Sequence, residues 1–531
     1  MTTQIDSSTL QQIEKSRLSV QIALDAQKTP QERNKCGQYA TPPALAVEVA
    51  RCVRVMMPES CPPLAFCEPA LGTGAFYSAF LSVFPAECIQ RATGVEIDPN
   101  FATFAQDLWS ASGLEVLEGD FTTLLRQGHL PKPANVVLTN PPYSRHHHLT
   151  PTQKQQLQAE AARLTGIKVN GLAGLYVYFM LIASAWMQDD GVAAWLLPSE
   201  FMDVNFGAAI KSYLLRHAAD VWIHRFDPCD VQFADALVSS AIVIFRKAEH
   251  RPGATIRMSY GGSLQQPQSS QDVPLEKLSK ARKWTSFPQR HPILEDLQED
   301  KESTLGNFFD IKRGIATGAN KVFIMPRAEA ERRKFPASFL RPVLPSPRHL
   351  RDTVIETETD GYPQLAQPLC VIDCDLSPQA LQTEHRQLWD YLEETASKGF
   401  EGRYILMNRR LWYKQETRLP APFLCTYMGR DKGENKPFRF LWNRSQATAT
   451  NLYLLLYPKG QLAELLKEQP ALEATVYEAL NQLGDEISAQ GRFYGGGLHK
   501  IEPNELRRVP ARRLLDLMPQ LDKLSQLSLE F

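Results

Sequence analysis

The sequence lacks a long hydrophobic run. Its most apolar stretch, from Leu172 to Trp186, contains a glycine and a serine and is shorter than the roughly 20 residues that a membrane-spanning helix needs. Residues Met1 to Leu10 are polar and lack the apolar core of a signal peptide. We therefore expect a cytoplasmic protein with no membrane segment.

Paired cysteines are also missing. The chain has 9 cysteines at irregular spacing, and none of them forms a Cys-x-x-Cys motif. This spacing argues against a disulfide framework and against a zinc ribbon. A chain of this kind is typical of a reducing compartment.

An excess of charge of either sign is absent as well. The 58 Lys and Arg nearly balance the 59 Asp and Glu, which gives a net charge of −1. Any nucleic-acid-binding surface must therefore be local. The 531 residues are enough for about three domains and for more than one hydrophobic core.

Residues 64–81 follow the pattern of a strand, a glycine turn and a helix. The apolar start is followed by Glu68 and Pro69, and then by the turn glycines Gly72 and Gly74. Glycines at these positions let the backbone approach a ligand closely. Alone, this pattern is weak evidence, because most Gly-x-Gly turns bind no nucleotide.

Two later segments end in residues that suit a nucleotide. Glu96 and Ile97 follow a predicted strand about 20 residues beyond the glycine turn, where a ribose-binding carboxylate belongs in a doubly wound sheet. Asp120 and Phe121 follow the next strand and offer an acceptor for an adenine amino group and a wall for its ring. We therefore expect a doubly wound α/β sheet with a nucleotide-type ligand at its carboxyl edge.

A fourth strand end carries the residues that suggest chemistry. The apolar segment 136–138 leads into Asn140, Pro141, Pro142 and Tyr143, and the prolines forbid continuation of the strand. The side-chain oxygen of Asn140 and the nearby backbone carbonyls are acceptors that suit an exocyclic NH2 group, and Tyr143 adds a flat face. Taken alone, the tetrapeptide is better explained as a strand followed by a Pro-Pro turn.

Together these motifs resemble those of the S-adenosylmethionine-dependent methyltransferases. Their order, with a recognition region last, is similar to the gamma class of DNA adenine-N6 methyltransferases in type II restriction–modification systems. One departure is Leu71, where that family often has Cys. The resemblance implies a catalytic motif of Asn140, Pro141, Pro142 and Tyr143, and S-adenosylmethionine contacts from Thr41, Glu68, Pro69, Gly72, Gly74, Glu96, Ile97, Asp120 and Phe121.

The resemblance also implies double-stranded DNA as a partner and a target adenine that leaves the duplex. It suggests Phe233 as a second aromatic face for that base, although a core position is equally compatible with the sequence. Arg145 and the three histidines after it favour a phosphate or base contact over a metal site, because consecutive histidines cannot all reach one ion. A cognate restriction endonuclease is expected to be encoded nearby, without necessarily being bound.

The C-terminal part carries a local basic surface. Residues 403–444 hold ten Lys and Arg against three Asp and Glu, with eight aromatic residues among them. Basic side chains neutralise phosphates and read base edges, and aromatic residues stack on bases. A solvated structural surface is the alternative. The DNA-binding candidates are Arg409, Arg410, Trp412 and Tyr413, with Lys500 in a glycine-rich loop.

We expect a Rossmann-like class I methyltransferase domain over residues 37–250, preceded by an N-terminal helical arm over 1–36. A linker rich in Pro, Gln, Ser and Gly is predicted over 251–300, followed by a mixed α+β target-recognition domain over 301–531. Other substrates of the same tetrapeptide remain open: cytosine N4, RNA and protein glutamine. A bifunctional restriction–methylation enzyme is disfavoured because the stretch before Thr41 leaves no room for a nuclease module, and a non-catalytic DNA-binding subunit is the third alternative.

Overall fold

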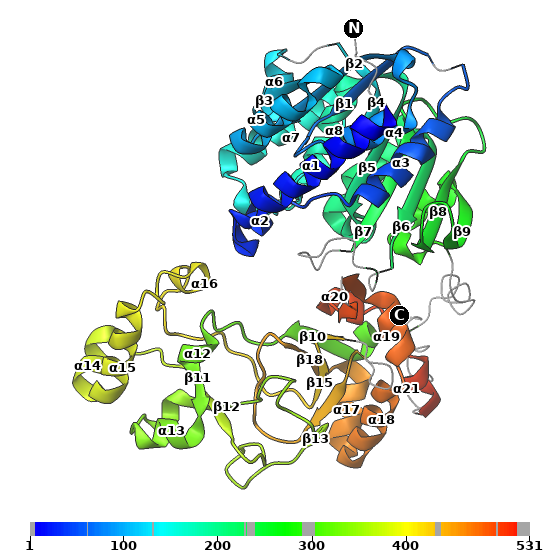
Figure 1. The fold of residues 1–531 in the computed structure, drawn as a ribbon. Helices are drawn as coiled ribbons and strands as arrows, with labels where there is room; N and C mark the ends of the chain where they lie inside the picture. Colours follow the sequence, from blue (N-terminus) through cyan, green and yellow to red (C-terminus); the bar gives the residue numbers. More distant parts are fainter. Residues whose placement is uncertain are drawn as a thin grey trace. The chain divides into compact units, whose positions relative to one another are not determined.

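The computed structural model describes residues 6–60, 62–129, 132–227, 230, 239–288, 303–430, 437–494 and 497–517. The chain divides into two compact units (Figure 1). Unit 1 comprises residues 1–292 and 494–496, and unit 2 comprises residues 293–493 and 497–531.

Unit 1 is built on a sheet with the strand order β3-β2-β1-β4-β5-β7-β6-β8-β9 over the described residues. The strands β3, β2, β1, β4 and β5 run parallel, and β7 inserts antiparallel between β5 and β6. This arrangement confirms the expected doubly wound α/β class. The strands are β1 (Leu64–Glu68), β2 (Ile89–Glu96), β3 (Leu114–Glu118), β4 (Ala134–Thr139), β5 (Met187–Pro198), β6 (Ala219–Arg225), β7 (Ser240–Arg246), β8 (Thr255–Gly262) and β9 (Pro267–Pro274).

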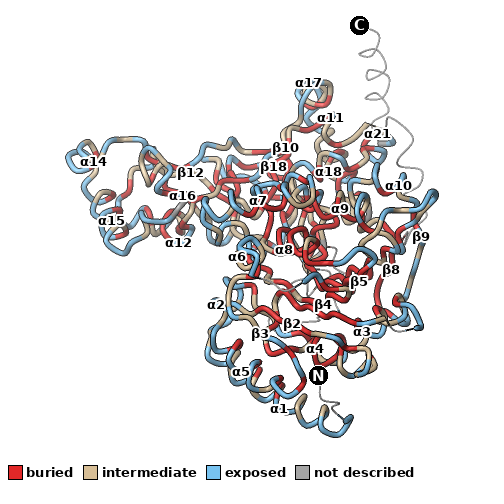
Figure 2. The backbone as a smooth tube through the Cα atoms, turned by 90° about the horizontal axis from the view of Figure 1, so that it is seen from above, coloured by how far each residue is buried: buried red, intermediate tan, exposed pale blue. Residues whose placement is uncertain are grey.

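Helices cover both faces of this sheet. Figure 2 shows α1, α3, α4 and α5 on one side of the strands and α6, α8 and α9 on the other. Strands covered on both faces need continuous apolar runs, and Val136, Val137 and Leu138 of β4 are indeed fully buried. The helices are α1 (Ser7–Ala26), α2 (Pro30–Cys36), α3 (Pro43–Met56), α4 (Ala75–Val83), α5 (Pro99–Trp109), α6 (Phe121–Gln127), α7 (Pro151–Thr165), α8 (Leu175–Ala183), α9 (Ala208–His217) and α10 (Leu275–Lys280).

The predicted linker is wrong for most of its length. β8, β9 and α10 fall inside 251–300, and β8 pairs with both β6 and β9 in the sheet of unit 1. The physical reason is the edge position of β9, where most residues are exposed or only half-buried. An edge strand of this kind is polar, so its composition resembles that of a linker.

Unit 2 has the mixed α+β architecture that the sequence predicted. In the described residues its sheets have the orders β10-β18-β15-β17-β13, β11-β14-β12 and β16-β20-β19. The strands are β10 (Phe309–Arg313), β11 (Ile324–Pro326), β12 (Leu340–Val343), β13 (Val354–Ile355), β14 (Leu369–Ile372), β15 (Phe423–Thr426), β16 (Met428–Arg430), β17 (Phe440–Asn443), β18 (Tyr453–Pro458), β19 (Arg492–Tyr494) and β20 (Leu498–Lys500).

Separate hydrophobic clusters support this unit, one of them around Leu456 and another around Val371. None of the helices in the described part of the chain combines the length and apolar character needed to cross a lipid bilayer. The helices of unit 2 are α11 (Leu305–Phe308), α12 (Asn320–Phe323), α13 (Arg327–Arg332), α14 (Pro378–Glu384), α15 (Arg386–Ser397), α16 (Tyr404–Met407), α17 (Gly460–Glu468), α18 (Glu473–Asn481), α19 (Gly484–Gln490), α20 (Pro503–Leu506) and α21 (Arg512–Leu517).

Candidate active site

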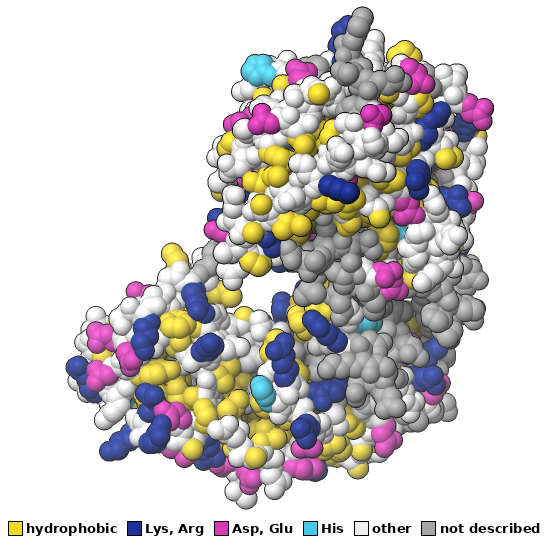
Figure 3. Space-filling view, in the orientation of Figure 1, with side chains coloured by type: hydrophobic (Ala, Val, Ile, Leu, Met, Phe, Trp, Pro, Cys, Tyr) yellow, Lys and Arg dark blue, Asp and Glu magenta, His cyan; other side chains and the backbone are white. Residues whose placement is uncertain are grey.

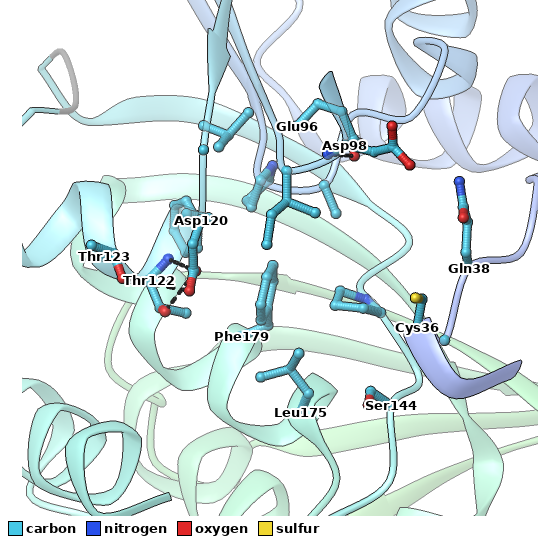
Figure 4. Close-up of a pocket in the computed structure, with 18 of the residues that line it drawn as sticks. Cys36, Gln38, Glu96, Asp98, Asp120, Thr122, Thr123, Ser144, Leu175 and Phe179 are labelled. Carbon is cyan, nitrogen blue, oxygen red and sulfur yellow. Dashed lines mark hydrogen bonds between the residues drawn. The ribbon is translucent and has the colours of Figure 1, made fainter. Parts of the chain in front are cut away.

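A cavity of about 950 Å³ lies at the carboxyl ends of β1, β2, β3 and β4. This is where open α/β sheets bind their ligands, and the volume suits a nucleotide-sized molecule. Figure 4 shows carboxylates, hydroxyl groups and apolar side chains arranged around it. The predicted site residues that line the cavity are Pro69, Gly72, Glu96, Ile97, Asp120, Phe121, Asn140 and Pro142.

Asn140 has one half of its amide engaged and the other half without a partner. Its Nδ2 donates hydrogen bonds to the backbone oxygen of Tyr39 at 2.9 Å and to Oγ1 of Thr41 at 3.2 Å. A carbonyl can only accept, so the bond to Tyr39 fixes which end of the amide carries nitrogen. Oδ1 is buried and has no hydrogen-bond partner among the described residues. The amide is thus held so that it presents an acceptor.

Thr41 therefore contributes to the cavity indirectly. It does not line the cavity itself, but its Oγ1 accepts a hydrogen bond from Asn140, which does. Pro141 is likewise absent from the lining, and Pro142 is present. The 39–41 segment and the tetrapeptide lie 99 and 101 positions apart at these two bonds. Sequence reasoning named Thr41 and the tetrapeptide, but not the contact between them.

Tyr143 does not line the cavity as the expected flat face. Its side chain is 8% exposed, and its hydroxyl donates to the backbone oxygen of Leu196 at 3.0 Å. Burial raises the pKa of Tyr143 well above its ordinary value. The ring of Tyr39 lies 5.6 Å from that of Tyr143, and Tyr39 is the one of the two that lines the cavity. The sequence analysis did not single out Tyr39.

The helical arm holds the tetrapeptide from the other side. Gly37 ends α2 with φ +69°, and its oxygen accepts a hydrogen bond from Tyr143 N at 3.0 Å. Ser144 Oγ donates to the oxygen of Lys35 at 3.0 Å. A Cβ atom at position 37 would overlap the backbone nitrogens of Tyr143 and Ser144. Only glycine allows this approach of the two segments.

Glu96 closes the glycine turn. Its two carboxylate oxygens accept hydrogen bonds from Gly72 N at 2.7 Å and from Asp98 N at 2.8 Å. Burial raises the pKa of Glu96 above its ordinary value. Gly74 does not line the cavity, and its φ of +87° at the start of α4 shows a role in the turn itself. Ile97 next to Glu96 is 68% exposed.

Asp120 and Phe121 have structural roles besides their place at the cavity. Asp120 caps α6, where its Oδ1 accepts from Thr122 N at 2.9 Å and Thr122 Oγ1 at 2.7 Å (Figure 4). Phe121 is 1% exposed, and its ring lies 5.6 Å from that of Phe179. Phe179 also lines the cavity, at the opposite side from Glu96. It is a second aromatic wall that the sequence analysis missed.

Glu68 lies behind the glycine turn rather than at the cavity wall. It is 2% exposed, its Oε2 has no partner among the described residues, and burial raises its pKa well above the ordinary value. The 1% exposed Arg17 of α1 donates to Thr73 Oγ1 at 2.9 Å, and Thr73 donates to Gln21 of the same helix at 2.7 Å. The arm thus clamps the glycine turn as well as the tetrapeptide.

Replacing Arg17 by alanine is expected to raise the KM for the ligand of the glycine turn by roughly tenfold, because Thr73 loses a buried hydrogen bond. Steady-state kinetics with the two substrates varied in turn measure each KM separately. Arg17→Lys, which keeps a donor, should recover part of the loss. Arg332→Ala is the control: like Arg17, which pairs with Glu14 at 2.6 Å, Arg332 pairs with a glutamate three residues away, but its side chain is 75% exposed. An equal change in both KM values would contradict this role.

The Arg145–His148 segment lies next to the tetrapeptide. The three histidines form a short 3-10 turn, and His148 lines the cavity. Burial, followed by the nearby Lys154, lowers the pKa of His146. Burial, followed by His147, lowers the pKa of His148. Across the described ranges, no group of His, Cys, Asp and Glu side chains is arranged to hold a metal ion.

The candidate DNA-binding residues of unit 2 differ in exposure. Arg410 is exposed and Trp412 is half-buried, whereas Tyr413 is 1% exposed and donates to the oxygen of Leu376 at 2.6 Å. Tyr413 is therefore a core residue, contrary to its expected place on the basic surface. The sequence analysis placed Tyr413 on the basic surface because its position beside several arginines does not show which side of the loop faces inward.

Two further candidates have partners, and one lies outside the described residues. Arg409 donates to the oxygen of Ala316 at 2.7 Å and to Gln415 at 3.2 Å. Lys500 pairs with Glu502 at 2.9 Å and lies 5.1 Å from the centre of the Tyr427 ring. The predicted base contact at Phe233 falls outside the described part of the chain.

Family models match most of the chain. The model of the C-terminal domain of the type II methyltransferase M.Eco57I matches residues 281–529, and the model of the Eco57I restriction-modification methylase matches residues 127–231. The first match covers unit 2, and the second contains the tetrapeptide.

Curated and solved relatives agree with these matches. The type II methyltransferase M.XamI of Xanthomonas campestris pv. amaranthicola is 28% identical over 454 residues, which is 84% of this chain and 80% of that protein. M.AccI of Acinetobacter calcoaceticus is 22% identical over 493 residues, 90% of this chain and 85% of that protein. The fold is similar to that of the type IIL restriction–modification enzyme MmeI, solved in complex with DNA, with a TM-score of 0.53 and 12% identity over 83% of this chain and 65% of that chain. The chain is therefore similar, over most of its length, to type II restriction–modification methyltransferases.

Proposed function

We propose that this chain methylates N6 of an adenine in double-stranded DNA, as the modification enzyme of a restriction–modification system. Its cofactor is S-adenosylmethionine, which supplies an electrophilic methyl group on a sulfonium centre. The single observation that carries the proposal is Asn140, whose amide is held by Tyr39 and Thr41 so that Oδ1 remains a buried acceptor without a partner among the described residues.

The residues at the cavity fit this cofactor. Glu96 is a carboxylate at the end of the second strand, beside the backbone of Gly72, which is the place of a ribose contact in doubly wound sheets. Asp120 and Phe179 border the same cavity and offer an acceptor and an aromatic wall for an adenine ring. The cavity volume of about 950 Å³ leaves room for a target base as well.

The chain contributes orientation and electrostatics to the reaction. An exocyclic amine on a purine is a poor nucleophile, because its lone pair is delocalised into the ring. Asn140 Oδ1 would accept one hydrogen of the amine, and a backbone carbonyl of the tetrapeptide would accept the other, so that the lone pair is directed out of the ring plane. The same acceptors stabilise the positive charge that develops on nitrogen. No covalent nucleophile is required.

Adenine N6 is favoured over the other amines for two reasons. The motif order resembles adenine enzymes, and the residue before the prolines is Asn140, whereas cytosine N4 enzymes more often have Ser. Unit 2, which matches the C-terminal domain of M.Eco57I, is the proposed target-recognition domain. A base in a duplex must swing out to reach the cavity, and Tyr39 is an aromatic side chain at the cavity wall on which it would stack. A separate endonuclease with the same target site is the proposed functional partner.

The test is expression of the chain in a bacterial host without adenine or cytosine DNA methyltransferases, followed by mass analysis of nucleosides and sequencing of modified bases. N6-methyladenine at one sequence motif is the expected result. N4-methylcytosine would move the activity to cytosine. In vitro incubations of the purified chain with DNA, RNA and protein run in parallel, and methyl transfer confined to RNA or protein would overturn the proposal.

Replacing Glu96 by glutamine is expected to raise the KM for S-adenosylmethionine by about tenfold to a hundredfold, because charged acceptors make the stronger hydrogen bonds. Since burial raises the pKa of Glu96, its carboxylate is protonated at a higher pH than an exposed glutamate. As the solution is acidified, the affinity of the wild type for the cofactor should therefore begin to fall at a higher pH than the protonation of an exposed glutamate would give. Steady-state kinetics at neutral pH measure the change in KM. Titration calorimetry with S-adenosylhomocysteine from neutral to acidic pH measures the change in affinity.

Glu118→Gln is the matched control, since Glu118 lies directly opposite Glu96 in the parallel pair of β2 and β3 and is exposed. It should leave the affinity and its pH dependence unchanged. An acid-dependent loss of affinity that persists in Glu96→Gln would show that a different group titrates.

A further inference from the structure

The short helix α16 of unit 2 exposes apolar side chains in basic surroundings. Ile405 is 44% exposed and Met407 is 69% exposed, whereas Leu406 between them is fully buried. Leu406 packs in the hydrophobic cluster that contains Ile315 and Phe323. The buried residue fixes the helix, so the exposure of its two neighbours is a consequence of a defined packing arrangement rather than of a loose chain.

Hydrogen bonds on both sides of α16 attach it to the loop after β10. Arg403 donates to the oxygen of Gly318 at 3.0 Å, and Arg409 donates to the oxygen of Ala316 at 2.7 Å. Gly318 has a φ of +75°, and a Cβ atom there would lie 3.0 Å from Cδ2 of Leu406. The helix therefore fits tightly against this loop, which is the rigidity that an inserted side chain needs.

The chain on both sides of the exposed apolar pair is rich in arginine. Arg403, Arg409 and Arg410 flank α16 in sequence, and Lys321 of α12 is exposed. Figure 3 shows Lys and Arg side chains gathered on the part of unit 2 that carries α16 and α12. Acids near α16 include Glu401 before it and Glu416 after it in sequence, both exposed, and Asp373, which pairs with Lys414 at 3.1 Å.

This combination fits one kind of partner. An apolar side chain is costly to expose and gains by entering an apolar environment. Among polyanions, duplex DNA offers both phosphates for the guanidinium groups and an apolar interior between its stacked bases. Met, Ile and Leu are the side chains that DNA-bending proteins insert between base steps from the minor groove. A second copy of this chain would instead bring like charges together.

We propose that Met407 and Ile405 form a wedge that enters the base stack of bound DNA and kinks it, with the arginines of α16 on the flanking phosphates. The inference rests on the proposed function, because it takes DNA as the substrate. It assigns a DNA-deforming role to α16, which is separate from the chemistry at Asn140.

The experiment uses the full-length chain and a short duplex that contains the methylation site found by sequencing. The bend angle is measured by energy transfer between dyes at the two ends, and 2-aminopurine at successive positions reports unstacking. Met407→Gln keeps the length of the side chain but removes its apolar character, and Ile405→Ala tests the second residue. Leu419→Ala is the matched control, since Leu419 is an equally exposed apolar residue of unit 2, 70% exposed.

The wild type and Leu419→Ala should bend the duplex and raise 2-aminopurine fluorescence at one base step away from the methylated base. Met407→Gln should lose both signals and bind the site about tenfold more weakly. If wild-type protein methylates DNA but Met407→Gln bends it equally, the wedge is wrong and the methyltransferase stands. If wild-type protein methylates no DNA, the proposed function itself fails. A Met407-dependent dimer in sedimentation, with an unbent duplex, would assign α16 to self-association and overturn the wedge.

Discussion

Replacing Asn140 by alanine is expected to lower kcat by about a hundredfold to a thousandfold, the loss seen when one preorganised hydrogen-bonding group is removed from an active site. The side-chain acceptor Oδ1, which is buried and has no partner among the described residues, disappears with it. Binding of S-adenosylhomocysteine should persist, because Glu96 and Gly72 are on other strand ends. Single-turnover methyl transfer and calorimetry measure the two properties separately.

The control lies on the same strand. Asn135 at the other end of β4 accepts from Ala65 N at 2.8 Å and donates to the oxygen of Pro63 at 2.9 Å, so it is an equally engaged amide away from the cavity. Asn135→Ala should lower the melting temperature and retain methyl transfer below it. Residual activity of Asn140→Ala near that of Asn135→Ala would remove Asn140 from the mechanism.

Replacing Gly37 by alanine is the second change with a large expected effect. The added Cβ would overlap the backbone nitrogens of Tyr143 and Ser144, and backbone cannot rotate away as a side chain does. The tetrapeptide would have to move, and a displacement of about 1 Å costs roughly a hundredfold in rate. We expect that loss in kcat, measured with both substrates saturating, together with a lower free energy of unfolding.

Gly166→Ala separates the two causes of this loss. Gly166 ends α7 with the same φ of +69° as Gly37, but a Cβ atom there would meet nothing within 4 Å. This control should cost about 1–2 kcal/mol of stability for the left-handed backbone alone and leave kcat unchanged. If the two alanine variants have the same kcat, the contact between the arm and the tetrapeptide does not matter for catalysis.

Much of unit 1 is predictable from local pattern. Parallel strands covered on both faces require apolar runs such as 136–138, and the chain must turn at prolines that follow them, which places Asn140 at the carboxyl edge. β9 was missed for the opposite reason, since an edge strand with a solvated face has no such run, and its neighbour β8 was missed with it. Composition then points to a linker although backbone pairing holds the segment in the sheet.

The site residues that could be predicted are those whose context is local in sequence. Residue type and spacing indicated Glu96 and Asn140, whose neighbours along the chain supply most of their context. Tyr39 and Arg17 were missed because their roles depend on contacts with residues 101 and 56 positions away. Asp120 shows a different limit of prediction from sequence. A carboxylate at the end of a strand can contact a ligand, but this one also caps α6, and its sequence position cannot separate the two roles.

Helices α1 and α2 both support the site: Arg17 of α1 bonds to Thr73, and Gly37 at the end of α2 bonds to Tyr143. The geometry of the site therefore depends on this N-terminal segment. A gene copy that lost only its first codons, up to residue 37, would encode a product with every strand of the sheet intact and nothing to brace either wall of the cavity. Such a copy would keep the sheet and the tetrapeptide but, under the proposed function, would lose methyl transfer. For the same reason, a synthetic peptide with the sequence of residues 7–37 is a rational starting point for an inhibitor that works by displacement.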